Sequence, residues 1–445
     1  INSLLENENL ESFKADGNFE IVNREAVLDM NLKFDKFNLG VLGSLGGDVL
    51  SNIRGYVSGN ASVGGNVKKP KINGRLYLEK TGMTIPYLNV DYELNDRSVV
   101  DLTEQKFLFR NNVLTDTKFN TKGSLEGSIE HDVFSDWKLD LTINSKKLLA
   151  LNTQDHEDAA YYGTAFINGE ASIKGPTNGL FIKVEAQSEK GTTLKIPIND
   201  AESVSENSFI HFLTAKEKYN IEKGIVENSR KYKGLELEFD LDITPDAEVE
   251  VIFDRSSGHG LKGKGYGTLL FKINTLGRFN MWGNFQAYEG SYNFKYGGLI
   301  DKKFLVEKGG SIEWFGDPMK AVLNLKAVYK TIANPSVLLE NSSFNRKVPV
   351  DVVIGIRGDL ASPEPDFNIE FPTVSNVLKS EIQYKLNDKD VRQTQALYLL
   401  SSGGFLSPEG VSQSDFSGSL FETASSLLGG IIKSEDEKFK VGLNY

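Results

Sequence analysis

The run from Leu235 to Ile243 constrains the fold of this chain more than any other segment. Its five apolar residues occupy alternate positions, and a carboxylate fills each of the four gaps between them. Successive side chains of a β-strand point to opposite faces of a sheet, so the run predicts a strand with one apolar and one strongly solvated face. A helix would distribute the same residues around its whole circumference.

Similar alternation recurs at 28–34, 137–143 and 323–329. Many one-sided strands in series predict a large sheet whose apolar face needs a cover. Two kinds of cover are consistent with the sequence. One is a second sheet of the same chain, as in a sandwich or barrel, and the other is a guest molecule in an open trough. If the trough is correct, its expected lining consists of apolar strand residues: Leu235, Leu237, Phe239, Leu241, Ile243, Val348, Val350, Val352, Ile354, Phe367, Ile369 and Phe371.

The composition narrows the classes of function. Hydrophobic residues make up 39% and charged residues 25% of the 445 residues, which is typical of a folded chain. The net charge of −11 argues against nucleic-acid binding and against docking on anionic lipid headgroups. The chain has no cysteine, which excludes disulfides and thiolate metal sites. No apolar stretch approaches the roughly 20 residues that a membrane-spanning helix needs.

A degenerate repeat opens at Gly59, Gly169 and Gly267. Each unit reads as a strand, a short connection and a hairpin, and we expect the glycines to mark turns, where positive φ costs little. Repeated units of this kind predict stacking into one long sheet. We therefore divide the chain into groove units at 1–115, 116–234 (with a polar insertion at 198–232) and 235–372.

Residues 373–434 form the segment with a convincing helical pattern. Thr373 or Ser375 can cap a helix that ends near Leu386, and Asp388 or Asp390 can start another that ends near residue 402. A third helix is predicted from an apolar stripe at 420–431. We interpret the segment as a plug for the end of the trough. Contact with a membrane surface is the alternative, disfavoured because the stripe carries few basic residues.

The search for catalytic chemistry gives little. The four histidines, His131, His156, His211 and His259, are far apart in the sequence. Residues 155–158 offer oxygen and nitrogen donors, but adjacent loop positions rarely converge on one metal ion. The run 258–265 approaches a phosphate-binding loop, yet it lacks the final hydroxyl and precedes a strand, so we interpret it as a flexible hairpin turn. We expect no enzyme activity, no catalytic residue, no metal and no cofactor.

Two motifs resemble a known family. Residues 309–318 read Gly-Gly-Ser-Ile-Glu-Trp-Phe-Gly-Asp-Pro, and an alternating strand follows at 321–327. A glycine-led strand, a Gly-Asp-Pro turn and an alternating strand resemble a hallmark of the C-terminal domain of the TamB family. The segment 390–405 resembles the family's helical segment, with Thr394-Gln395-Ala396-Leu397 in place of a serine-glutamine-alanine-leucine theme. The resemblance is good over about 235–432 and is limited to the repeat style over 1–234.

The resemblance implies an elongated, curled antiparallel sheet that forms a taco-like groove with an apolar interior, as in AsmA-like bridge proteins. It implies a place in the periplasm of a Gram-negative bacterium, in a protein held in the inner membrane by a segment outside this chain. The implied partners are an outer-membrane barrel of the TamA or BamA type, phospholipids and unfolded outer-membrane protein strands. No catalytic residue is defined for the family.

Two functions follow as hypotheses. The first is a bridge segment whose groove conducts phospholipids or supports outer-membrane protein assembly and secretion. The second is a module that docks a barrel strand by β-augmentation without lipid transport. Its candidates lie in the terminal strand predicted at 435–445, which also reads as a groove strand cut short: Phe439, Val441, Leu443 and Tyr445.

Overall fold

The structure, a computed structural model, describes residues 2–7, 10–46, 50–133, 135–156, 159, 161–197, 235–254, 258–274, 278–296, 299–339, 344–360 and 364–407. Its strands form one 22-stranded sheet. The strands are β1 (Asn2–Asn7), β2 (Leu10–Val22), β3 (Glu25–Asn38), β4 (Ser51–Asn66), β5 (Lys71–Ile85), β6 (Val90–Leu94), β7 (Ser98–Glu104), β8 (Lys106–Asp116), β9 (Lys122–Asp132), β10 (Ser135–Thr153), β11 (Tyr162–Pro176), β12 (Phe181–Ser188), β13 (Thr193–Pro197), β14 (Glu236–Ile243), β15 (Glu248–Asp254), β16 (His259–Asn274), β17 (Phe279–Tyr296), β18 (Ile300–Val306), β19 (Ser311–Gly316), β20 (Val322–Ala333), β21 (Val348–Asp359) and β22 (Glu364–Glu370).

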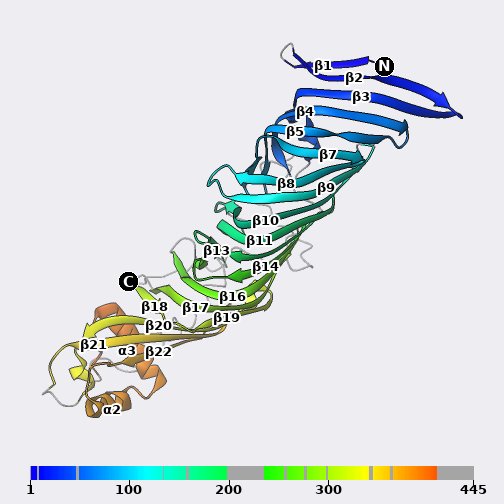
Figure 1. Ribbon diagram of the computed structural model, residues 1–445. Coiled ribbons are helices and arrows are strands. Elements are labelled where there is room, and N and C mark those ends of the chain that lie inside the picture. Colours follow the sequence, from blue (N-terminus) through cyan, green and yellow to red (C-terminus); the bar gives the residue numbers. More distant parts are fainter. Residues whose placement is uncertain are drawn as a thin grey trace, which may run out of the picture.

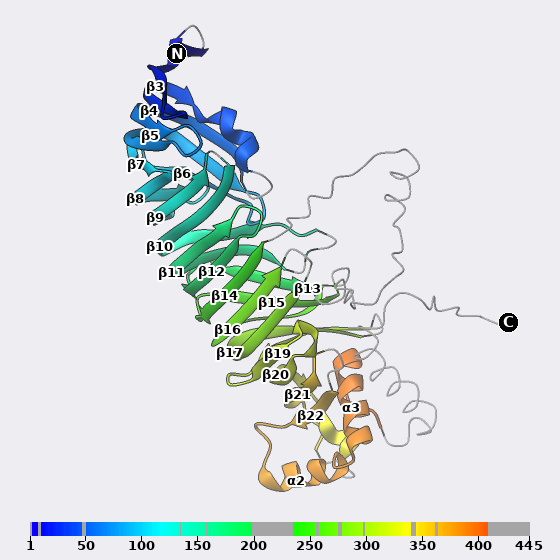
Figure 2. The same ribbon diagram turned by 90° about the vertical axis from the view of Figure 1, so that its right-hand side faces the viewer.

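The sheet is an elongated ladder that runs from β1 at one end to β22 and two helices at the other (Figure 1). Successive strands stack across the long axis and the sheet curls, as the view in Figure 2 shows. The prediction of a mainly β, curled sheet with a small helical segment near the C-terminal end is confirmed.

Several rungs of the ladder consist of two short strands placed end to end. The long strand β11 pairs with β12 over one part of its length and with β13 over another. The next rung, β14 and β15, pairs with β12 and β13 in the parallel sense. The antiparallel expectation is wrong at these two pairings. The chain leaves β13 at Pro197 and enters β14 at Glu236, and this long connection lets the two rungs run in the same direction.

Side chains supply hydrogen bonds where a rung is interrupted, at positions that we call the creases. Between β12 and β13, the Thr192 hydroxyl accepts from Phe166 N–H (3.0 Å) and donates to the Phe166 carbonyl (3.1 Å). Between β14 and β15, Thr244 N–H donates to Ser188 Oγ (2.9 Å), and its hydroxyl donates to the Ser188 carbonyl (3.0 Å). Because buried backbone groups need partners, these side chains allow the sheet to bend without leaving them unpaired.

The repeat glycines lie within strands, so the turn interpretation is wrong for them. Gly59 lies in β4, Gly169 in β11 and Gly267 in β16. A Cβ on Gly59 would lie 2.3 Å from the Arg75 carbonyl oxygen, and one on Gly267 would lie 1.9 Å from that of Asn284. Glycine is required there because the backbone of the neighbouring strand comes too close for a side chain.

The helical segment begins as predicted. Helix α2 spans Asn376–Lys385 after Ser375, and α3 spans Lys389–Ser402, with Asp388 accepting from two backbone N–H groups of its first turn. Three short 3₁₀ turns complete the elements: η1 (Leu39–Gly46), η2 (Pro318–Lys320) and η3 (Pro335–Leu338). The third predicted helix, the terminal strand and the insertion at 198–232 lie outside the described residues, and the groove-unit boundaries stay predictions.

Candidate functional site

A hollow of about 110 Å³ lies among the strands from β10 to β17; we call it the central hollow. Half-buried Phe239 and Leu241 line it, and Ile243 at the end of β14 is buried in its wall. The rest of the lining is almost entirely apolar and consists of these residues: Leu88, Ala150, Leu151, Tyr161, Ala165, Phe166, Ile167, Val184, Ser188, Thr192, Leu194, Ile196, Ala247, Val249, Phe271, Ile273 and Phe279.

A second, smaller hollow adjoins the first toward the C-terminal end. Leu194, Ile196 and Ile243 line both hollows, and so do Val249 and Phe271. The second hollow extends to the inward residues of β17, β19 and β20: Met281, Phe285, Ile312, Trp314 and Leu325. The apolar surface is therefore continuous from β11 to β20.

The predicted residues of the run 235–243, which contains β14, are divided between the central hollow and a packed cluster. Phe239, Leu241 and Ile243 face the central hollow. Leu235 and Leu237 are each 4% exposed and pack with Leu180 in a small core instead.

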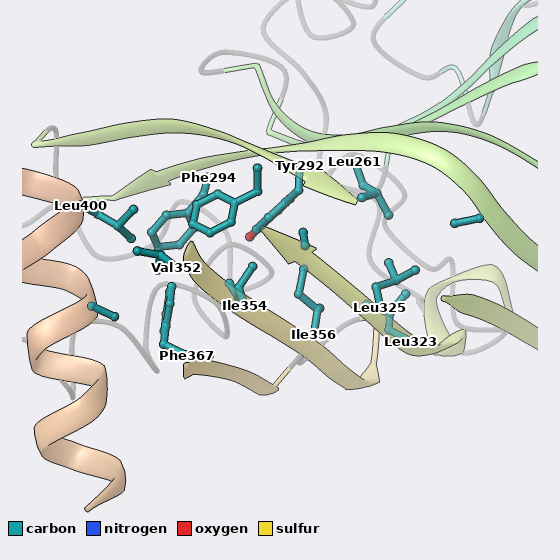
Figure 3. Packing of buried hydrophobic residues seen from close by; sticks show 14 of the residues in the cluster. Leu261, Tyr292, Phe294, Leu323, Leu325, Val352, Ile354, Ile356, Phe367 and Leu400 are labelled. Atoms are coloured by element: carbon teal, nitrogen blue, oxygen red, sulfur yellow. The ribbon is translucent and has the colours of Figure 1, made fainter. Parts of the chain in front are cut away.

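The predicted residues of β21 and β22 lie in a closed core. Val350, Val352 and Ile354 are each 0% exposed. Figure 3 shows Val352 and Phe367 facing Phe294 of β17 and Leu400 of α3, and the rings of Phe294 and Phe367 lie 5.7 Å apart. Since protein side chains cover these positions, their role as lining for a guest stays a prediction. The other predicted residues here are also buried: Val348, Ile369 and Phe371.

Sequence reasoning missed several residues of the hollows. Leu194 and Ile196 belong to the short strand β13, and Val249 belongs to β15. Each of these strands alternates for only a few residues, which is a weak signal for a lining position. Phe271 lies opposite Phe239 in the register of β14 and β16, so the pairing of those two strands identifies it.

Ion pairs join neighbouring strands across the polar face. Lys272 of β16 lies 3.0 Å from Glu238 of β14, and Lys262 lies 2.7 Å from Glu248 of β15. A hydrogen bond from Lys195 to Glu250 raises the pKa of the lysine, against the opposing effect of its partial burial. Glu238, one of the alternating acidic residues of β14, therefore has a structural partner on the neighbouring strand.

Two tyrosines contribute hydroxyl groups near the end of the central hollow. The hydroxyls of Tyr87 and Tyr161 lie 3.0 Å apart, and Tyr161 also lines the hollow. Burial, together with the neighbouring Tyr87, raises the pKa of Tyr161 well above its ordinary value, so the phenol is neutral. The hydrogen bond satisfies the polar end of an otherwise apolar side chain.

The described part of the chain holds no group of three or more His, Asp and Glu residues placed to bind a metal ion. His131 lies instead against the rings of Phe107 and Trp137. Residues 259–265 of the phosphate-loop-like run lie within strand β16 and pair with β15 or β17, so the interpretation of the run as a hairpin turn is wrong for them. Within the described residues, neither α2 nor α3 has the length and apolar character to cross a membrane.

Comparison with known proteins agrees with this architecture. No curated protein matches the chain. A family model, the TamB C-terminal domain, matches residues 110–440, which include β9 to β22, both helices and the lining of both hollows apart from Leu88. The match extends the resemblance seen in the motifs at 309–318 and 390–405 well toward the N-terminal end. Because it covers most of the sequence, the chain belongs to the TamB family.

Proposed function

We propose that this chain is a periplasmic segment of a bridge between the inner and outer membranes, whose concave apolar face carries phospholipid acyl chains. The observation that carries the proposal is the continuous apolar lining of the two adjoining hollows. Half-buried Phe239 and Leu241 support it further, because they leave apolar surface beside the hollow incompletely covered by the chain itself.

The physical basis is passive partition. Burial of each CH₂ group contributes about 0.8 kcal/mol and requires no polar partner, so an acyl chain suits a lining of Leu, Ile, Val and Phe. The headgroup stays in water at the open side of the sheet, and no covalent step is needed. Movement along the ladder then exchanges one apolar contact for another of similar free energy.

A carboxylate placed in the central hollow tests this proposal. Leu241→Asp puts a charge where an acyl chain would lie, and we expect the phospholipid that co-purifies with the protein to fall about tenfold. The measurement is native mass spectrometry of the purified protein. The matched control is Asn284→Asp, which adds a carboxylate at an exposed position of β17. Equal lipid content in both variants and the wild type would contradict the proposal.

Membership of the TamB family supports a partner at the outer membrane, and we propose a β-barrel of the TamA or BamA type that receives lipids or assembling outer-membrane proteins. The terminal residues Phe439 and Tyr445 are the predicted contacts. Photocross-linkers at these positions are expected to give adducts with the barrel. The same cross-linker at exposed Tyr56 on β4 is the control, and equal yields there would contradict the assignment.

A further inference from the structure

The side chain of Arg392 on helix α3 makes polar contacts with β22, the last described strand of the sheet. Its Nε donates to the Phe367 carbonyl of β22 at 2.9 Å. Its Nη1 donates to the carbonyls of Leu386 (3.1 Å) and Asn387 (3.3 Å), in the turn between α2 and α3. Its Nη2 lies 3.6 Å from the Asp366 carboxylate. A single guanidinium therefore ties together the strand, the turn and the helix.

The inner face of α3 closes the apolar side of the sheet. Ala396, Leu399 and Leu400 are at most 2% exposed and belong to the same core as Val352 and the other inward residues of β21. Leu400 lies next to Val352 and Phe294 in Figure 3. The second hollow reaches Leu325 of β20, which pairs with Ile356 of β21. Helix α3 therefore covers the side of β21 that continues the line of the two hollows.

The helix and the strands are attached in different ways. β20 and β21 share a ladder of backbone pairs from Val322 to Ala333, and β21 continues the ladder into β22. α3 is attached by its apolar face and by Arg392, while Gln395 fastens the following segment through two hydrogen bonds with Leu406 (2.8 and 2.9 Å). A helix can leave without breaking the strand ladder, so the local opening of α3 costs less than the separation of β20, β21 and β22.

We propose that α3 is a gate at the C-terminal end of the groove and that Arg392 is its latch. With the latch closed, the inward residues of β21 are sealed and a guest stops at β20. With the latch released, the apolar surface that α3 covers beside Val352 and Phe294 becomes a further section of the path. The movement of a guest into that section rests on the proposed function, whereas the opening of α3 does not.

Thiol labelling tests the latch without any guest. The chain has no cysteine, so a single introduced thiol is the only reactive one. Ala396→Cys reports on α3, and Ala327→Cys, equally buried at 0% exposure on β20, reports on the sheet. We expect Arg392→Gln to raise the maleimide labelling rate at position 396 about tenfold and to leave the rate at position 327 unchanged. Arg392→Lys should give an intermediate rate, because it keeps the charge and loses the planar fork.

Two labelling results would overturn the latch. Unchanged labelling at 396 would show that Arg392 does not hold the helix. A parallel rise at 396 and 327 would show that Arg392 supports the whole sheet.

A phospholipid with a photoreactive acyl chain tests the gate for a guest. In the wild type, adducts are expected on the strands of the central hollow, and in Arg392→Gln they should extend to β21. Adducts confined to the central hollow in both proteins would overturn the gate. An absence of adducts from the central hollow in both would count against the proposed function, while the thiol result would still decide the latch.

Discussion

Strands β3 and β21 carry the same alternation of apolar and polar residues, yet their inward faces lie in different environments. On β3, the inward residues Leu28 and Phe34 are half-buried, and on the neighbouring β2 Phe19 and Ile21 are 49% and 73% exposed. On β21, the inward residues are fully buried beneath the aromatic side chains of β17 and β18 and beneath α3.

The difference shows that alternation identifies the apolar face of a strand but not its cover. The N-terminal end of the ladder leaves much of that face to solvent or to a guest. The C-terminal end covers it with Phe294, Phe304 and Leu400, which come from other parts of the chain. The central hollow lies between these extremes, where the face is lined and only partly filled.

The largest expected effect is that of a buried charge at the closed end. Val352→Asp should lower the free energy of unfolding of the C-terminal region by at least about 4 kcal/mol, because the carboxylate has no polar partner there. Leu28→Asp, on the half-exposed face of β3, should cost about 1 kcal/mol or less. Denaturant unfolding followed by tryptophan fluorescence can separate the regions in variants that keep a single tryptophan, either Trp137 in β10 or Trp314 in β19. A similar loss of unfolding free energy in both variants would contradict the difference in burial between β3 and β21.

Removal of an aromatic ring should also cost more stability at the closed C-terminal end than on β3, although both losses should be smaller than that of a buried charge. Phe304 is 0% exposed, and Phe304→Ala should cost about 3 kcal/mol through lost burial and a new cavity. Phe34 is half-buried against Phe13 and Phe37, with ring centroids 5.1 and 5.9 Å away. Phe34→Ala should cost about 1.5 kcal/mol. Thermal melts of the two variants measure this, and an equal cost would mean that β3 is packed as tightly as β21.

The N-cap of α3 offers a weaker probe of the closed end. The Asp388 side chain accepts from Asp390 N–H and Val391 N–H, both at 3.0 Å. Asp388→Ala should destabilise the helix by about 1 kcal/mol and should increase hydrogen exchange in α3 without changing exchange in β20. The control is Asn387→Ala, which keeps the backbone carbonyl that Arg392 contacts. Increased exchange in β20 as well would mean that helix and sheet open together.

The smallest effect is a pH dependence confined to the N-terminal half. Burial lowers the pKa of His131 below its ordinary value of 6.5, although the nearby Asp132 opposes the shift. The unfolded chain then binds a proton more readily, so the stabilisation is complete above pH 6.5 and is lost as the pH falls through the lowered pKa. The unfolding midpoint reported by Trp137 should drop slightly between pH 7.5 and 5.5. His131→Gln should remove the change, and persistence of the change in that variant would assign it to another group.

Short-range signals predicted much of the fold. The alternation in β14 fixed which side of the strand is apolar, and Ser375 and Asp388 marked the starts of α2 and α3 within a residue or two. These features depend on neighbours in the sequence, so a single sequence contains them. The prediction that the sheet is curled came from the family resemblance of the motif at 309–318.

Features that depend on distant segments were not predictable in the same way. The parallel rungs arise because the chain returns at Glu236 beside a strand it left much earlier. The repeat glycines are fixed by the approach of a neighbouring backbone, which no local pattern reveals. For the site, Phe239 and Leu241 lie beside the central hollow, and their role as lining for a guest stays a prediction, whereas Val249 required knowledge of the pairing of β15.

The threonine and serine hydrogen bonds at the creases mean that a few single residues influence the shape of the molecule. Thr192 and Thr244 supply hydrogen bonds where a rung is interrupted, so we expect the gain or loss of one hydroxyl there to alter how strongly the sheet curls. The strands on either side would keep their alternation and their partners. The curvature of the sheet can therefore evolve separately from the residues that form its apolar face.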